Sequence, residues 1–152
     1  MNKQLKEVMT KEPVTVGPNV LATDALEIMR AWGLRHLPVT ENQQTIGLLS
    51  DRDIYKHLAL LPRQNLTVKD AMTSSPYVAQ GFEMLSKIAR TMADNKYGCT
   101  IVENAEGQIC GIFTTIDALY ILSNLLKESG ESEFHTMNIE DYLRVHQPRV
   151  AV

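Results

Sequence analysis

The sequence is poor in the residues that build metal clusters and membrane spans. Its 152 residues include two cysteines, Cys99 and Cys110, which form no C-x-x-C pair and have no histidine at metal-ligand spacing. Each lies in an apolar stretch, so we predict small buried side chains in a reducing compartment rather than a redox pair. The longest apolar runs, such as 58–62, are far shorter than the roughly 20 residues that cross a bilayer. The four histidines are scattered, and we expect no metal site.

An excess of basic residues and an apolar leader are also missing. Lysine and arginine number 15 against 18 aspartates and glutamates, which gives a net charge of −3 at pH 7. A protein that binds nucleic acid without specificity needs a basic surface, so we do not expect nucleic acid as the main target. The N-terminal residues carry no apolar core of a secretion signal. We therefore expect a cytoplasmic protein that does not associate with membranes.

What the sequence does contain is an internal repeat. Val8-Met9-Thr10 recurs 63 residues later as Ala71-Met72-Thr73. Segment 47–53, Gly-Leu-Leu-Ser-Asp-Arg-Asp, corresponds to segment 111–117, Gly-Ile-Phe-Thr-Thr-Ile-Asp, 64 residues later. Matches in the same order and at nearly constant spacing indicate two copies of one structural unit.

Each copy shows the same succession of predicted elements: a short strand, a helix, two strands around a polar turn, and a second helix. In the first copy these are expected at about 13–16, 21–32, 37–40, 45–49 and 51–61. In the second copy they are expected at about 77–79, 85–92, 99–102, 109–113 and 115–126. Apolar residues at helical spacing place Trp32 on the buried face of the first long helix, and Gly33 suits the position just after it.

The pattern predicts a mixed α/β (α+β) fold made of two β-α-β-β-α units. We place the first copy at residues 5–61, a linker at 62–68 and the second copy at 69–126. The C-terminal tail, 127–152, departs from the repeat, and its segment 139–145 favours one further short helix.

The sharpest chemical motif is a hydroxyl residue followed three positions later by an aspartate, at a strand-to-helix junction: Ser50-x-x-Asp53 and Thr114-x-x-Asp117. One interpretation is a helix cap, in which the hydroxyl and the carboxylate satisfy free amides of the first turn. The other is a ligand site, in which the carboxylate accepts the hydroxyls of a ribose while the hydroxyl and free amides hold a phosphate. Its presence in both copies favours the ligand site.

The repeat resembles a tandem pair of cystathionine β-synthase (CBS) domains, a Bateman module. In the first copy the resemblance rests on 8–10, 13–16, Arg-His-Leu-Pro-Val at 35–39, and 47–53; in the second it rests on 71–73, 76–78 and 111–117. Together they cover about residues 5–126. The second copy departs at 97–102, which lacks the proline, and at Ile116, where the first copy has Arg52.

The resemblance implies a pseudo-two-fold pair of units, with small sheets that carry helices on one side and ligand clefts between the units. It implies that Asp53 and Asp117 hold the ribose of an adenosine-containing ligand, and that Ser50 and Thr114 contact its ribose or phosphate.

The adenine would be framed by backbone of the first strand and of the His-Leu-Pro segment, here Val14, His36 and Leu37. Further ligand-binding candidates are Arg35, Arg52, Thr100 and Thr115. The cations predicted around the first motif are Arg35, His36, Arg52 and Lys56. Around the second motif the sequence offers no arginine, and Lys96 is the nearest cation in the equivalent segment.

These observations favour a stand-alone regulatory sensor of adenine nucleotides (AMP, ADP or ATP, with S-adenosylmethionine as a further candidate). We expect it to act as a homodimer on an unidentified effector protein and not as an enzyme, because no nucleophile, base or metal cluster stands at convincing spacing. A structural interaction module without a ligand is the alternative, and equilibrium binding of nucleotides separates the two.

Overall fold

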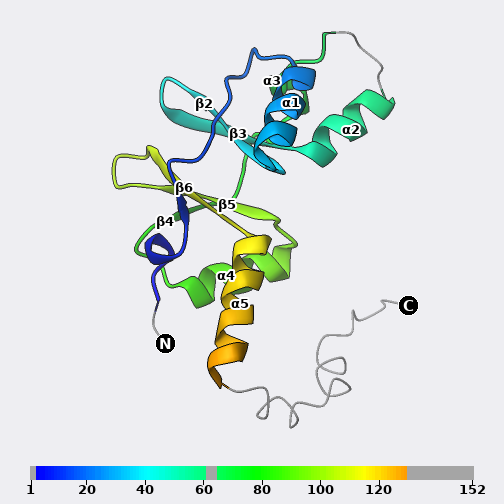
Figure 1. Cartoon of the computed structure of the whole chain (residues 1–152). Coiled ribbons are helices and arrows are strands. Elements are labelled where there is room, and N and C mark those ends of the chain that lie inside the picture. Colours follow the sequence, from blue (N-terminus) through cyan, green and yellow to red (C-terminus); the bar gives the residue numbers. More distant parts are fainter. Residues whose placement is uncertain (1–2, 61–64, 130–152) are drawn as a thin grey trace, which may run out of the picture. The chain divides into compact units, whose positions relative to one another are not determined.

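The computed structural model describes residues 3–60 and 65–129. The fold contains two small sheets (Figure 1). One sheet is the antiparallel hairpin of β2 (His36–Glu41) and β3 (Gln44–Ser50). The other has four strands in the order β1 (Thr10–Lys11), β6 (Ile109–Thr114), β5 (Cys99–Glu103) and β4 (Val78–Gln80). Only the β4–β5 pair among these strands is parallel.

The order of helices and strands follows the prediction except at 13–16, where a strand was expected and only an isolated bridge between Val16 and Val39 forms. The longer helices are α1 (Ala22–Trp32), α2 (Asp51–Leu60), α4 (Leu85–Asn95) and α5 (Thr115–Ser129). Two short helices, η1 (Leu5–Glu7) and α3 (Val68–Ala71), precede the two copies and were not predicted. The chain divides into two compact units, Met1–Asp117 and Ala118–Val152, and both sheets belong to the first. The mixed α/β class is confirmed, whereas the predicted helix at 139–145 lies outside the described residues.

The ends of α1 and α4 have the same backbone geometry but different residues. Gly33 ends α1 in the left-handed conformation, with φ of 65°, as expected. Lys96 holds the equivalent position after α4, with φ of 59°. A left-handed conformation costs a residue with a side chain roughly 1–2 kcal/mol, a cost that glycine avoids.

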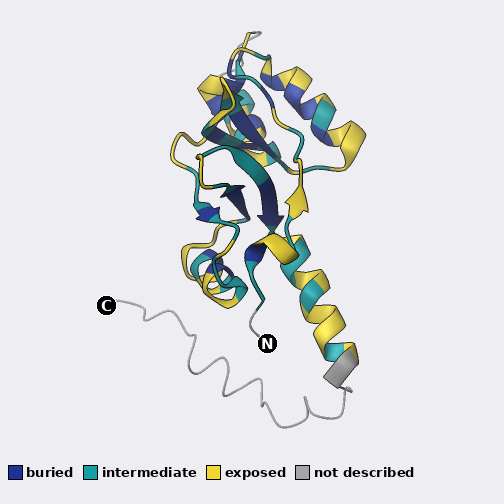
Figure 2. Ribbon diagram, turned by 90° about the vertical axis from the view of Figure 1, so that its left-hand side faces the viewer, coloured by how far each residue is buried: buried dark blue, intermediate teal, exposed yellow. Residues whose placement is uncertain are grey.

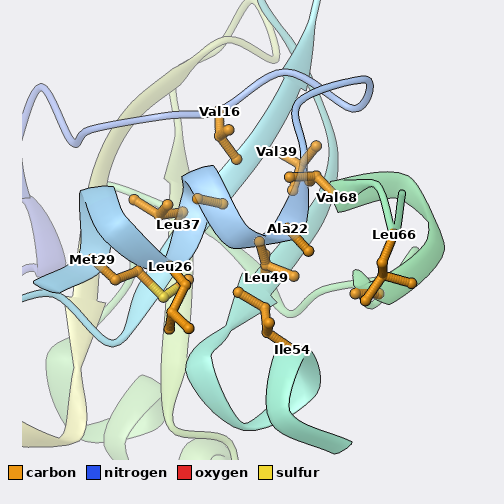
Figure 3. Close-up of a cluster of buried hydrophobic side chains, with 12 residues drawn as sticks. Val16, Ala22, Leu26, Met29, Leu37, Val39, Leu49, Ile54, Leu66 and Val68 are labelled. Carbon is orange, nitrogen blue, oxygen red and sulfur yellow. The ribbon is translucent and has the colours of Figure 1, made fainter. Parts of the chain in front are cut away.

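The buried core of the first copy includes residues from outside that copy (Figures 2 and 3). Its members from α1, β2, β3 and α2 include Met29, Leu37, Leu49 and Ile54, all essentially unexposed. Leu66, Val68 and Ala71 complete the same cluster, although they belong to the segment that leads into the second copy.

The leading segments of the two copies are exchanged. The Val68 amide donates to the Val20 carbonyl (2.8 Å), and the equivalent Leu5 amide donates to the Glu83 carbonyl (2.9 Å). Farther along, Thr73 exchanges two backbone hydrogen bonds of 2.9 Å with Leu48 in β3, just as β1 pairs with β6. The leading segment of each copy therefore completes the sheet and core of the other copy, so the repeat in the sequence and the packing unit do not coincide.

Gly47 and the equivalent Gly111 are explained by the close approach of the exchanged segments to their strands. A Cβ on Gly47 would lie 2.5 Å from the Met72 sulfur and 2.9 Å from the Thr73 carbonyl oxygen. The equivalent Gly111 faces Met9 and Thr10 in the same way. A side chain at either position would separate the strand from the segment that crosses it.

Substitution Gly47→Ala tests this close approach. We expect it to lower the free energy of unfolding by about 1–3 kcal/mol, the usual cost of overpacking, in a urea denaturation experiment. Gly17→Ala is the control, because the nearest atom to its added Cβ would be the Val20 Cγ2 at 4.0 Å. Equal stability of the two variants would show that Met72 and Thr73 do not restrict position 47.

Candidate functional site

The hydroxyl–aspartate motif forms a reciprocal helix cap in both copies. The Ser50 amide and hydroxyl donate to Asp53 Oδ2 at 3.0 and 2.6 Å, and the Asp53 amide donates to Ser50 Oγ at 3.2 Å. Thr114 and Asp117 repeat all three bonds, at 2.8, 2.7 and 3.3 Å. The capping interpretation is therefore correct. It does not exclude a ligand, because none of these bonds uses the second carboxylate oxygen, Oδ1.

The first amides of α2 are already bonded within the chain. The Asp51 amide donates to the Arg35 carbonyl (3.2 Å), and the Arg52 amide donates to Asp51 Oδ1 (2.8 Å). With the Asp53 amide on Ser50 Oγ, the first three amides of the helix all have acceptors. Free amides at the start of this helix were expected to hold a phosphate, but these three amides are not free. An anion beside this helix would depend on side-chain cations instead.

Two cavities of comparable size adjoin these helix starts. The Asp117 cavity, of about 420 Å³, contains Thr114 and Asp117 in its wall. The Asp53 cavity, of about 380 Å³, contains Ser50 and Asp53. Both volumes fall in the range typical of small-molecule sites.

Each cavity combines the motif of one copy with the strand-leading segments of the other. The Asp117 cavity takes Val14 and Leu34 from the first copy. The Asp53 cavity takes Tyr77 and Tyr97, their equivalents 63 residues later, from the second. A wall shared by both cavities consists of Arg35, His36, Gly98 and Thr115.

Nine of the eleven predicted ligand-binding residues line a cavity. Those on the Asp117 cavity are Val14, Arg35, His36, Thr114, Thr115 and Asp117. Those on the Asp53 cavity are Arg35, His36, Ser50, Arg52, Asp53 and Thr115. Thr115, like Arg35 and His36, lines both cavities.

Leu37 and Thr100, the other two predicted residues, line neither cavity, because both side chains are fully buried. They occupy equivalent places in β2 and β5, each next to a residue that faces a cavity, His36 or Cys99. Neighbouring side chains in a strand point to opposite faces, so the next residue enters the core. The Thr100 hydroxyl has no hydrogen-bond partner among the described residues.

The cations are distributed differently from the prediction. Lys96 was assigned to the second motif, but it lines the Asp53 cavity together with Arg35 and Arg52. Lys56 lines neither cavity. Among the residues that the structure describes, the Asp53 cavity thus has three lysine or arginine residues in its wall, whereas the Asp117 cavity has Arg35 alone.

His36 is not one of the positive groups. Burial lowers its pKa below the ordinary value of 6.5, against the opposing effect of Asp51. It packs closely on Gly98, where a Cβ would lie 3.1 Å from the imidazole Nε2. At neutral pH we therefore treat His36 as a neutral part of the shared wall, while Arg35 beside it pairs with Asp51 at 3.5 Å.

Aromatic side chains in both cavities were missed or misplaced by the sequence analysis. Tyr77 and Tyr97 stack with ring centroids 5.3 Å apart, and both line the Asp53 cavity. The sequence repeat could have identified Tyr77 and Tyr97, since they align with Val14 and Leu34. Trp32 was expected to cover a buried helix face, but it is 69% exposed and lines the Asp117 cavity.

The cysteines offer no reactive thiolate. Burial raises the pKa of Cys99 to about 12, and burial also raises the pKa of Cys110. Cys99 is buried as predicted, whereas Cys110 is only half-buried. Within residues 3–60 and 65–129 there is no group of three or more potential metal ligands. No helix of this described part is both long and apolar enough to span a membrane.

The repeat and the fold have counterparts in known proteins. The sequence model of the CBS domain matches residues 5–60 and 68–124, which together form most of the chain. The chain belongs to the CBS domain family. A curated relative of this CBS pair is the uncharacterised protein MJ1225 of Methanocaldococcus jannaschii, 27% identical over 151 residues, or 99% of the chain. The chain spans about half of that protein (52%) and smaller shares of two other relatives (24% and 33%).

Solved CBS structures share the fold. A Vibrio cholerae protein with the name AcuB superimposes with a TM-score of 0.75 at 25% identity, over 86% of this chain and 98% of that one. CBSX2 of Arabidopsis thaliana, solved in complex with AMP, gives a TM-score of 0.70 at 26% identity, over 80% and 97% of the two chains.

The half-buried imidazole of His36 predicts a pH dependence of stability. Because its pKa in the folded state lies below the ordinary 6.5, folding opposes protonation, and stability is lost as the pH falls from above 6.5 toward the lowered pKa. We expect the free energy of unfolding to decrease more between about pH 7.5 and about pH 5.5 in the wild type than in His36→Gln. Urea denaturation at both pH values measures this difference, and equal decreases would contradict the assignment.

Proposed function

We propose that this CBS pair is a cytoplasmic regulatory module that binds adenine nucleotides in the Asp53 and Asp117 cavities. The proposal rests above all on one observation: the same hydroxyl–aspartate pair stands in the wall of each cavity, at the start of a helix. The AMP complex of CBSX2 supports this choice of ligand.

The residues suit the parts of such a ligand. Asp53 and Asp117 each have Oδ1 outside the capping bonds, and a carboxylate oxygen accepts strong hydrogen bonds from ribose hydroxyls. Tyr77 and Val14, each from the opposite copy, offer apolar surface for the base. Arg52 in the Asp53 cavity supplies a charge for a phosphate.

The proposed function is ligand binding, and no covalent bond of the ligand is broken. Occupancy would act through an effector protein or a change in oligomeric state, because a ligand can shift a conformation only by binding one state better than another. The shared wall of Arg35, His36, Gly98 and Thr115 offers a place where a ligand in either cavity contacts the same side chains.

Substitution of the two aspartates tests the site. We expect Asp53→Ala and Asp117→Ala each to weaken AMP binding at the affected cavity by about tenfold or more, because each removes a charge-assisted hydrogen bond worth about 1.5–3 kcal/mol. Calorimetric titration with AMP, ADP, ATP and S-adenosylmethionine gives the affinities. Each variant also loses a helix cap, so we expect a stability loss of about 1 kcal/mol.

Asp70→Ala is the matched control. Asp70 makes the same capping bonds with Thr67 in α3 but lines neither cavity, so its loss should lower stability and leave nucleotide affinity unchanged. If a folded Asp53→Ala protein binds AMP as the wild type does, the ribose assignment fails. If the wild type binds none of the four ligands, the structural interaction module is the better account.

We further propose a homodimer formed through α1 and α2. Their large apolar residues Trp32, Tyr55 and Leu60 are 69%, 49% and 69% exposed, and a second copy related by two-fold symmetry would cover them. Light scattering at micromolar concentration should give twice the 17.1 kDa mass of the chain. A monomeric mass both with and without AMP would contradict the dimer.

A further inference from the structure

Gly33 and Lys96 are one of several pairs of equivalent wall positions at which the two cavities differ. Gly33 lines the Asp117 cavity, and Lys96 lines the Asp53 cavity. Both residues follow a helix directly and both have a left-handed backbone, with φ of 65° and 59°. The backbone geometry is the same, so the difference between the cavities at this point is the lysine side chain.

Lysine is an unfavourable choice for this backbone. Glycine adopts the left-handed conformation freely, and the first copy uses it there. A strained residue in a cavity wall suggests that its side chain serves the site. The alternative is structural, because a cation after a helix interacts favourably with its last carbonyls and α4 has no basic residue in its last turn.

The surroundings of Lys96 favour an anion with several charges. Arg35 and Arg52 line the same cavity, and the first three amides of α2 already have acceptors within the chain. A phosphate chain there must therefore be held by side-chain cations. Lys96 and Arg35 come from the equivalent helix-to-strand connections of the two copies, and Arg52 comes from α2.

The Asp117 cavity has the opposite character. Within the described part of the chain, its wall contains two carboxylates, Glu12 and Asp117, and Arg35 as the single lysine or arginine. Ile116 stands where the other copy has Arg52. Trp32, Val14 and Ile112 add apolar surface. The wall of the Asp53 cavity also holds two carboxylates, Asp51 and Asp53, but its three cations outnumber them. In the Asp117 cavity the carboxylates outnumber the cations, and because like charges repel, a chain of phosphates is disfavoured there.

We propose that Lys96 is a specificity-determining residue that makes the Asp53 cavity a site for nucleoside polyphosphates. The Asp117 cavity, with glycine at the equivalent position, takes nucleosides with little or no negative charge. This inference rests on the proposed function, and it adds which class of nucleotide each cavity selects.

Exchange of the two residues tests the inference. In the Asp117→Ala background, Lys96→Gly should weaken ATP binding by about tenfold and leave adenosine binding unchanged, because only the phosphates lose a partner. Lys96→Arg should keep the ATP affinity. Conversely, Gly33→Lys in the Asp53→Ala background should strengthen ATP binding, because the added ammonium group gives the phosphates a partner. A Cβ at Gly33 would meet no atom within 4 Å. Added salt should reduce both differences.

Thermal denaturation separates ligand binding from a structural role. Glycine adopts the left-handed backbone conformation more easily than lysine does. The thermal denaturation midpoint of Lys96→Gly should therefore equal or exceed that of the parent protein. A lower midpoint with unchanged ATP affinity would overturn the inference in favour of a purely structural lysine. Equal losses for adenosine and ATP would also overturn it.

Titrations of the wild type and of Lys96→Gly alone separate a failure of this inference from a failure of the proposed function. They also avoid the additional aspartate substitutions. Lys96→Gly is also titrated in the otherwise unchanged chain, where the same preferential loss of ATP binding is expected. If the wild type binds adenosine and ATP but the exchange changes nothing, the Lys96 inference alone fails. If the wild type binds neither, the proposed function fails as well.

Discussion

The exchange of leading segments is the constraint on which the rest of this structure depends. Residues 3–11 pair with the second copy, and residues 66–73 pair with the first, through equivalent backbone hydrogen bonds. Leu66, Val68 and Ala71 complete a core that the first copy cannot complete alone. Because each sheet needs the leading segment of the other copy, neither sequence repeat is a complete packing unit.

The cavities follow from this arrangement. Each aspartate motif meets strand-leading residues of the other copy, so Asp53 faces the same cavity as Tyr77, and Asp117 the same cavity as Val14. The helix cap is compatible with the ribose contact that we propose, because it uses one carboxylate oxygen and the other stays outside the capping bonds. The bonded amides of α2 leave anion recognition to side chains, which is where the two copies differ.

The elements of the fold could be predicted because their signals are local: helical spacing of apolar residues, polar turns between short strands, and Gly33 after a helix. The motif residues were found because they recur. The contacts between copies could not be predicted, since spacing within one copy does not say which cavity Lys96 or Tyr97 joins. The side chains of Leu37 and Thr100 line neither cavity, because side chains alternate along a strand. Leu37 was predicted to contact the ligand through its backbone, and that contact stays a prediction.

The central claim is that each ligand site is built from both copies. A crystal structure of the protein with AMP bound tests it most directly. We predict that the ribose hydroxyls contact Asp53 while the base lies against Tyr77, or that they contact Asp117 while the base lies against Val14. AMP held by residues of a single copy, or bound away from both cavities, would contradict the account.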